Sequence, residues 1–252
     1  MAGQAPGEQV RRACAEIVAA WGQSPDPSWC APCLGVLPVS GAAVSLLAGG
    51  NQVTLCATDK VAALVDELQF DLGEGPGWQA VEAGLPVLVP QLRGRSGHRW
   101  PLLAEALRES PVEAIFAFPL RIGPVRLGAL DLYQTLPGPL PSVAVRDAAA
   151  LARALSQAVA RRLLEDDPSR WTEDGPSRDG SSPDGADPAW GAVGSRREVH
   201  QAIGMVLAQL SAAPADALAV LRAHAYAEGR PMIDVARDVV ARRLHFGGPA
   251  LP

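Results

Sequence analysis

Long hydrophobic runs are missing from this sequence: none approaches the roughly twenty apolar residues that a membrane-spanning helix needs. The first twenty residues carry several charged side chains between Glu8 and Glu16, so they lack the uninterrupted apolar core of a secretory signal peptide. Both absences favour a cytoplasmic protein without a membrane partner. Cysteine is scarce, and in the cytoplasm its four occurrences are expected to be reduced: Cys14, Cys30, Cys33 and Cys56.

Sequence motifs of catalysis are absent as well. The chain has no GxSxG nucleophile elbow, no HExxH zinc motif and no conspicuous pair of carboxylates. The glycine-rich segment 71–77 (DLGEGPG) lacks both the GK[ST] ending of a P-loop and the GxGxxG of a dinucleotide site. Cys30 and Cys33 form a CxxC pair, but a loop precedes it where a thioredoxin-type motif needs a strand, and no second pair completes a zinc site. We therefore expect no catalytic residue, no cofactor and no metal, and interpret the pair as structural thiols.

A large excess of positive charge is also lacking. The 252 residues carry a formal net charge of −5, so any contact with nucleic acid must come from a local patch. The hydrophobic fraction of 48% is enough for a well-filled core and argues against global disorder. At this length the chain has room for one or two domains.

The first two thirds of the chain mix helical and strand patterns. Apolar residues three and four apart predict helices at residues 7–21, 59–68, 78–83, 100–109 and 142–165, the second of them capped by Asp59. Short apolar runs bounded by turn residues predict strands at residues 41–47, 52–57, 86–89, 114–120 and 127–133. This mixed order predicts an α+β domain with helices packed on an antiparallel sheet.

A compact helical module follows a segment that has no hydrophobic periodicity. Residues 166–194 are rich in proline, glycine, serine and aspartate, which predicts a flexible, disordered linker. Residues 195–246 then show apolar positions at helical spacing in three successive segments, with Pro214 and Gly229 suited to the start and the end of the second helix. This all-α module contains seven arginines and five acidic residues, a formal charge of +2. Gly204 lies inside the first helix, where we expect it to mark a close helix crossing.

Four short segments of this module form a specific pattern: residues 195–197 (SRR), 201–207 (QAIGMVL), 221–222 (LR) and 234–236 (DVA). With them, residues 195–246 resemble the ANTAR domain, the RNA-binding module of transcription antitermination regulators. Many members of that family have lysine where this chain has Ile203, so one basic group is missing here. The resemblance implies an RNA-binding surface, for which the candidate residues are Arg196, Arg197, His200, Gln201, Arg222 and Arg230.

The first part of the chain carries a second set of motifs: residues 71–76 (DLGEGP), 84–89 (GLPVLV), 118–120 (FPL) and 128–133 (GALDLY). With them, residues 7–165 resemble a GAF domain. The resemblance implies a sensory domain whose glycine-rich loop borders a small-molecule pocket, with Trp78 and Phe118 as candidate pocket residues. GAF and ANTAR domains often occur together in bacterial regulators, so each resemblance supports the other.

The two resemblances together imply a bacterial transcription antitermination regulator. Its ANTAR module would bind nascent RNA hairpins that overlap a terminator, and its GAF domain would sense a signal or a small-molecule ligand. Relatives of this kind act as homodimers, since paired hairpin loops need two modules; helix 142–165 could supply a dimer seam or close the core of its own domain. The alternative is a ligand-binding or protein-interaction regulator whose three-helix module no longer binds RNA, which Ile203 and the modest charge of +2 favour.

Overall fold

The computed structural model describes residues 6–20, 27–48, 51–93, 99–165, 191–211 and 213–247. Contacts within the chain separate two compact units, one formed by Met1–Ala48 with Gln52–Glu173 and the other mainly by Asp174–Pro252. Residues 166–190, which make up most of the predicted linker, lie outside the described part of the chain. Helix α8 (Gly191–Leu210) begins earlier than the predicted start of the C-terminal module at residue 195.

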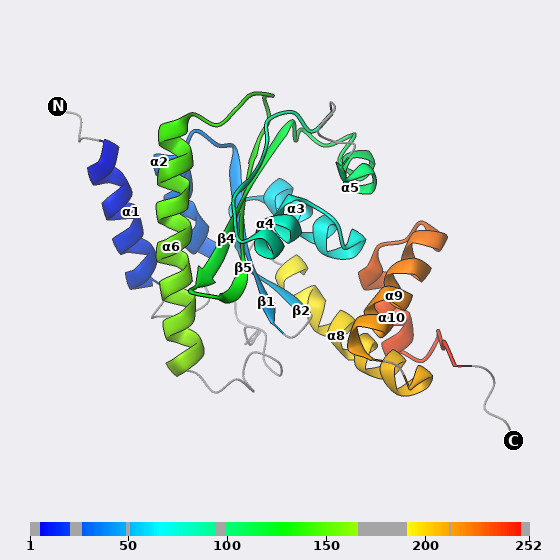
Figure 1. Ribbon diagram of the computed structural model, residues 1–252. Helices are drawn as coiled ribbons and strands as arrows, with labels where there is room; N and C mark the ends of the chain where they lie inside the picture. Colours follow the sequence, from blue (N-terminus) through cyan, green and yellow to red (C-terminus); the bar gives the residue numbers. More distant parts are fainter. Residues whose placement is uncertain are drawn as a thin grey trace, which may run out of the picture. The chain divides into compact units, whose positions relative to one another are not determined.

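The N-terminal unit is built on a five-stranded sheet (Figure 1). Its strands are β1 (Gly41–Ala48), β2 (Asn51–Ala57), β3 (Val87–Val89), β4 (Ala114–Ile122) and β5 (Val125–Gln134). They follow the order β2-β1-β5-β4-β3, so β2 and β3 are the edge strands. The pairs β1–β5, β4–β5 and β3–β4 are antiparallel, with Val44 opposite Leu130 and Phe116 opposite Leu132. All five strands lie where the sequence predicts them.

Helices cover both faces of this sheet, as Figure 1 shows. One face carries α1 (Pro6–Ala20), the 3-10 helix η1 (Pro27–Cys30), α2 (Ala31–Val36) and α6 (Ser142–Glu165); the other carries α3 (Lys60–Leu72), α4 (Pro76–Ala83) and α5 (Pro101–Ala106). Because side chains alternate along a strand, β4 places Phe116 and Phe118 in the core under α6 and Ile115 in the core under α3 and α5. The predicted class, an antiparallel sheet with packed helices as in a GAF domain, is confirmed; only η1 and α2 were not expected.

The predicted N-cap of α3 is present and also anchors the helix to the sheet. Asp59 Oδ1 accepts hydrogen bonds from the backbone N–H groups of Val61 (2.8 Å) and Ala62 (2.9 Å). The same oxygen accepts the hydroxyl of Tyr133 on β5, at 3.1 Å. Burial, with Asp59 beside it, raises the pKa of Tyr133 to about 12. This anchor fixes the start of α3, whose later turns carry Asp66 against the sheet.

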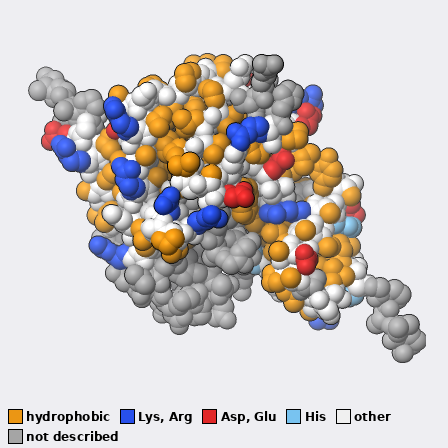
Figure 2. All heavy atoms as spheres, viewed as in Figure 1, with side chains coloured by type: hydrophobic (Ala, Val, Ile, Leu, Met, Phe, Trp, Pro, Cys, Tyr) orange, Lys and Arg blue, Asp and Glu red, His pale blue; other side chains and the backbone are white. Residues whose placement is uncertain are grey.

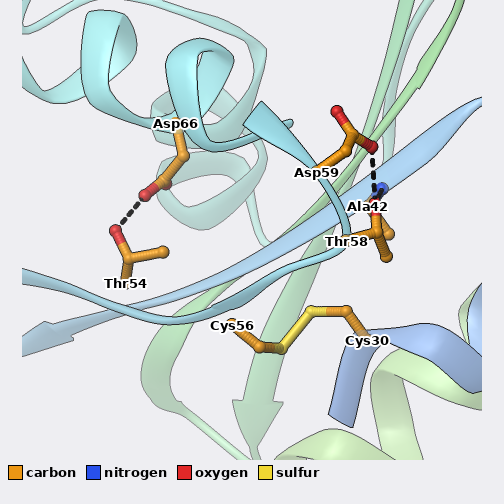
Figure 3. The surroundings of a disulfide bond; sticks show 7 residues. All are labelled: Cys30, Ala42, Thr54, Cys56, Thr58, Asp59 and Asp66. Atoms are coloured by element: carbon orange, nitrogen blue, oxygen red, sulfur yellow. Dashed lines mark hydrogen bonds between the residues drawn. A yellow bond between two sulfur atoms is a disulfide. The ribbon is translucent and has the colours of Figure 1, made fainter. Parts of the chain in front are cut away.

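The expectation that all four cysteines are reduced is wrong for two of them, because Cys30 and Cys56 form a disulfide (Figure 3). Cys30 ends η1, Cys56 lies in β2, and both are fully buried. The sequence does not reveal this pair, because it predicts a loop before Cys30. In the structure these residues form η1, which leads into α2, and the two elements place Cys30 against β2. Cys14 and Cys33 are free thiols. Burial raises the pKa of Cys33 to about 12, so this thiol stays protonated.

The C-terminal unit contains the three predicted helices: α8, α9 (Pro214–Glu228) and α10 (Met232–Val240). Their buried faces carry most of the apolar residues that the helical spacing predicts, and others besides: Val199, Ala202, Ile203, Val206, Ala217, Leu218, Leu221, Ala225, Met232, Val235, Ala236 and Val239. Leu210, which the spacing places on the same face of α8, is 37% exposed. Pro214 opens α9, and Gly229 ends it in the left-handed conformation with φ of 63°. After α10, the backbone N–H of Phe246 donates to Gln209 Oε1 of α8 at 2.9 Å, which ties the end of the module to its first helix.

Helix α8 departs from expectation at Gly204. A Cβ atom added to Gly204 would meet no atom within 4 Å, and the residue is exposed, so the predicted close helix crossing is wrong. Nothing in the structure explains the glycine. Among the described residues no single helix is long and apolar enough to cross a membrane; Glu198–Leu210 and Pro214–Glu228 meet that test of length and composition only as a pair, bent by 106°.

Candidate RNA-binding surface and ligand site

Four of the predicted RNA-binding residues lie in α8. Arg196 and Arg197 belong to the helix, but their side chains lie outside the described part of the structure. His200 is half-buried and Gln201 is exposed. Since Ala202 beside them is fully buried in the bundle, the helix turns Gln201 away from the core. The polar edge of α8 is thus available to a partner at Gln201.

The face of α9 that Arg222 borders also carries an aromatic side chain. Arg222 is half-buried beside the buried Leu221. One turn later Tyr226 stands 66% exposed, on a side of the helix where Ala219 and Ala223 are also exposed. Exposed aromatic rings near arginine suit the stacking of unpaired RNA bases. Tyr226 is not among the RNA-binding residues predicted from the sequence, although a single aromatic residue among alanines is a readable signal.

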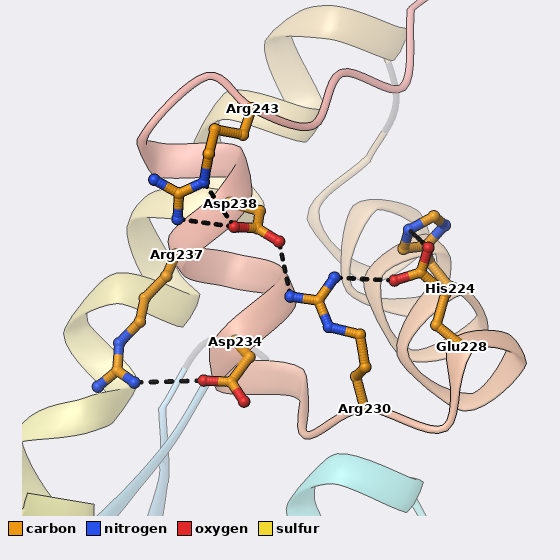
Figure 4. A network of polar contacts seen from close by, with 7 residues as sticks. All are labelled: His224, Glu228, Arg230, Asp234, Arg237, Asp238 and Arg243. Carbon is orange, nitrogen blue, oxygen red and sulfur yellow. Dashed lines mark hydrogen bonds and ion pairs between the residues drawn. The ribbon is translucent and has the colours of Figure 1, made fainter.

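Arg230 lies in an ion-pair network (Figure 4). Its guanidinium contacts Glu228 at 2.9 Å and Asp238 at 2.6 Å, and Asp238 also accepts from Arg243 at 2.7 Å. Hydrogen bonds from Arg230 and Arg243 lower the pKa of Asp238, and the hydrogen bonds that Arg230 makes to Asp238 and Glu228 raise the pKa of Arg230. The network joins the connection after α9 to α10 and to the turn that follows it. An RNA phosphate would therefore have to compete with two carboxylates for Arg230.

The arginines of α10 and of the following turn differ in their pairing. Arg237 contacts Asp234 at 3.3 Å and Glu198 of α8 at 3.4 Å. Arg242 is exposed, has φ of 58° and makes no ion pair with any residue that the structure describes. Its charge is not compensated within that part of the chain, so Arg242 can meet a phosphate without losing an internal partner.

Basic side chains are dispersed on the face of the molecule that Figure 2 shows. Lysine and arginine side chains stand there singly among hydrophobic and neutral atoms and do not merge into one basic patch. Residues 195–246 have a formal charge of only +2. A contact with nucleic acid at this module would therefore involve few phosphates and depend on the position of individual arginines.

In the N-terminal unit, buried polar side chains gather between the sheet and helices α3 and α4. Asp66 of α3 is completely buried and accepts hydrogen bonds from Gln52 Nε2, at 2.6 Å, and from the Thr54 hydroxyl. Figure 3 shows the bond between Thr54 and Asp66 close to the disulfide of the same strand. Buried carboxylates persist when they receive such hydrogen bonds. Asp66 thereby fastens α3 to the edge strand β2.

Gln69 connects α3 to both β5 and α4. Its Nε2 donates to Asp131 Oδ2 at 3.0 Å, and its Oε1 accepts the backbone N–H of Gly77 at 2.7 Å. The indole N–H of Trp78 donates to the backbone carbonyl of Gln69 at 2.8 Å. A Cβ atom at Gly77 would lie 2.8 Å and 3.0 Å from the two carboxyl oxygens of Asp131, so glycine is needed for α4 to approach β5 this closely.

Asp131 is the most perturbed group of this cluster. It is 4% exposed, and its Oδ1 has no hydrogen-bond partner among the described residues. Burial, reinforced by the charge of Asp66, raises the pKa of Asp131 to about 8, against the opposing effect of the hydrogen bond from Gln69. The carboxyl group keeps its proton at neutral pH, and it would accept a cation once ionised. A buried carboxyl with a strongly raised pKa is typical of functional sites.

A cavity of about 10 Å³ adjoins Asp131, lined by Ser45, Gln52, Gln69, Gly77, Trp78, Val81, Ala129 and Asp131. Trp78, a predicted pocket residue, is therefore at this site, but Phe118 is not. Phe118 points into the core on the opposite face of the sheet, because side chains alternate along β4. The structure thus does not bring the two predicted pocket residues together. It assigns instead Asp131 and Gln69, and the readable signal for Asp131 is a charged residue inside the apolar strand GALDLY.

Comparisons with known proteins give matches of two kinds, one to a family model and the other to solved structures. Residues 190–240 match the family model of the ANTAR domain. The chain is similar to the GAF domain of a phosphoenolpyruvate-protein phosphotransferase from Acinetobacter (TM-score 0.48, 14% identity, 63% of this chain and 96% of that chain). It is also similar to free methionine-R-sulfoxide reductase from Neisseria meningitidis, solved with its substrate (TM-score 0.48, 13% identity, 66% and 97%). No curated protein matches the sequence. The chain carries an ANTAR domain at residues 190–240, behind a GAF-like α+β domain.

Proposed function

We propose that this protein is a bacterial, cytoplasmic transcription antitermination regulator. The ANTAR domain binds nascent RNA hairpins that overlap a terminator, and the GAF-like domain senses the signal that controls this binding. The match of residues 190–240 to the ANTAR domain carries the proposal, and helices α8 to α10 supply the three-helix bundle. The protein acts as a regulator in this scheme and not as an enzyme.

The alternative is a regulator whose module no longer binds RNA, and the basic group missing at Ile203 favours it. Ile203 is only 6% exposed, so its side chain packs inside the bundle. A lysine at this place would have to extend its stem out of the core to reach water. Ile203 therefore fills the interior of the bundle, and the charge that such a lysine would carry to the surface is absent here.

We assign different roles to the arginines of the module. Arg242 and Arg222 are the proposed phosphate contacts, with Tyr226 as a stacking platform for an unpaired base. Arg196 and Arg197, with His200 and Gln201, remain proposed contacts on the strength of the family resemblance. Arg230 first stabilises the bundle through Glu228 and Asp238, and contacts RNA only if those ion pairs open.

A homodimer is part of the proposal, because two hairpin loops require two modules. The described part of the apolar stripe of α6 is unsuited to the seam, since Leu151, Leu155 and Val159 are fully buried inside their own unit. Of the two roles considered for this helix, closing the core fits the structure. The dimer contact is therefore proposed to use a surface other than this stripe.

Filter binding with the full chain tests the function. The probe is an RNA with two hairpins, the second overlapping a terminator; the matched control RNA keeps both stems but has altered loops. We expect preferential binding of the first RNA, with a shallow dependence on salt of about 0.7 per phosphate contact on single strands. Binding of neither RNA at any salt concentration would favour the alternative regulator.

A further inference from the structure

We infer that the cavity between the sheet and helices α3 and α4 binds a primary ammonium group, either the ammonium ion itself or the amine end of a small ligand. The sensing role proposed for the N-terminal unit is the basis of this inference, which names the chemical class of the signal. The first observation is an incomplete set of hydrogen bonds. Asp131 is 4% exposed and lines the cavity, and its Oδ1 has no hydrogen-bond partner among the described residues. Buried polar atoms are rarely left in this state, and an ionised carboxylate only accepts hydrogen bonds, so a donor completes the site once Asp131 has lost its proton.

Charge determines which donor fits. Asp66, completely buried, lies close enough to Asp131 to act on its ionisation, and it is held by Gln52 and Thr54 of β2. No lysine, arginine or histidine is among the residues that line the cavity. Asp131 is the one carboxyl group in a lining without a basic side chain, so once ionised it attracts a cation and repels an anion, and the nearby Asp66 adds to this effect. Trp78 also lines the cavity, and indole rings attract ammonium groups over their faces.

Size then limits the cation. A cavity of about 10 Å³ has room for one group of the size of a water molecule. An ammonium group has that size and donates hydrogen bonds, whereas a guanidinium or a quaternary ammonium is too large. Gly77 keeps this space open, because a Cβ atom there would lie 2.8 Å and 3.0 Å from the oxygens of Asp131.

A proton competes with the ammonium group for Asp131. The pKa of Asp131 is raised to about 8 by burial and by Asp66, the other buried carboxyl that acts on it, and ammonium binds the ionised form. The elements around the carboxyl otherwise present neutral groups: Ser45, Gln52, Gln69, Gly77, Trp78, Val81 and Ala129. Apparent affinity therefore rises with pH, by roughly 50-fold between pH 6 and pH 8.

Thermal unfolding of the full chain without RNA tests this inference. At pH 8 we expect ammonium chloride to raise the melting temperature by about 2–4 °C over an equal concentration of sodium chloride, and the difference to vanish at pH 6. Ethylammonium separates the two sources: a shift with it as well indicates the amine end of a ligand, and a shift with ammonium alone indicates the ion. An equal effect of tetramethylammonium, which has no N–H group, or no shift at all, overturns the inference.

Variants connect the shift to the cavity. Asp131→Asn keeps the shape of the side chain and removes its charge, so ammonium chloride should no longer raise the melting temperature. The matched control, Glu82→Gln, removes a carboxylate from the exposed side of α4 and should keep the ammonium-dependent rise. A shift that persists in Asp131→Asn is incompatible with the site. If that variant does not fold, Gly77→Ala fills the space beside Asp131 and should abolish the shift. If the chain binds RNA but ammonium does not raise its melting temperature, only this inference is rejected. If ammonium raises the melting temperature but the chain binds no RNA, only the proposed RNA function is rejected.

Discussion

Replacement of Asp131 by asparagine should change how the stability of the protein depends on pH. The pKa of this carboxyl is 3.8 as its ordinary value and about 8 in the folded chain, because burial and Asp66 disfavour its charge. Below pH 3.8 both the folded and the unfolded chain hold the proton, so burial of the neutral carboxyl carries no electrostatic penalty. As the pH rises, the unfolded chain releases the proton first, and the free energy of unfolding falls until about pH 8.

The structure gives the size of this effect. One unit of pKa difference corresponds to about 1.4 kcal/mol, so the parent loses about 2 kcal/mol of stability between pH 6 and pH 7.5 through Asp131 alone. Relative to a pH below 3.8, the free energy of unfolding is lower by about 4 kcal/mol at pH 7 because of Asp131. Asparagine does not titrate, so the stability of Asp131→Asn relative to the parent should rise by about 2 kcal/mol over the same interval.

Urea unfolding of the full chain in sodium chloride, followed by tryptophan fluorescence, measures this difference at each pH. Glu82→Gln is the matched control, because it removes an exposed carboxyl from the same region and should follow the parent at every pH. Parallel pH profiles for Asp131→Asn and the parent would show that Asp131 is ionised in the folded chain, and would refute the reasoning.

Three further predictions concern the disulfide and the helical module. Replacing Cys30 and Cys56 together by serine should lower the free energy of unfolding by about 3.5 kcal/mol, as expected for a loop closed over a sequence separation of 26; an unchanged urea midpoint would contradict this. Arg242→Ala should weaken RNA binding and reduce the slope of log affinity against log salt concentration by about 0.7, without changing the melting temperature. Arg230→Ala should instead lower the melting temperature. If Arg242→Ala lowers the melting temperature and Arg230→Ala weakens RNA binding, the two assigned roles are exchanged. Gly204→Ala should stabilise α8 by about 1 kcal/mol, since the added methyl meets open space, and a lower melting temperature would point to a contact made by this glycine.

Features that depend on neighbouring residues could be read from the sequence. The cap at Asp59 and the helix end at Gly229 are set by local backbone chemistry, and both are found where predicted. Strands such as β5 were found because an apolar run and a turn suffice to define them. In each case the deciding interactions lie within a few residues along the chain.

The candidate ligand site could not be predicted in the same way. Its central bond joins Gln69 and Asp131, which are 62 positions apart, and depends on how α3 and β5 meet. The disulfide depends on the 3-10 helix η1, but the prolines and serines of this segment predict a loop. Phe118 failed as a pocket residue because a motif places a residue on a strand, while the register of the sheet decides which face it joins.

The attachment of β2 determines where the sheet can begin to open. Edge strands usually fray first, since they are paired on one side only. Here one edge is held by a covalent bond from Cys56 to Cys30 and by the hydrogen bonds of Gln52 and Thr54 to Asp66. The other edge, β3, pairs through only three residues, Val87–Val89. Local opening should therefore start at β3, next to α4, and amide hydrogens there should exchange with solvent sooner than those of β2.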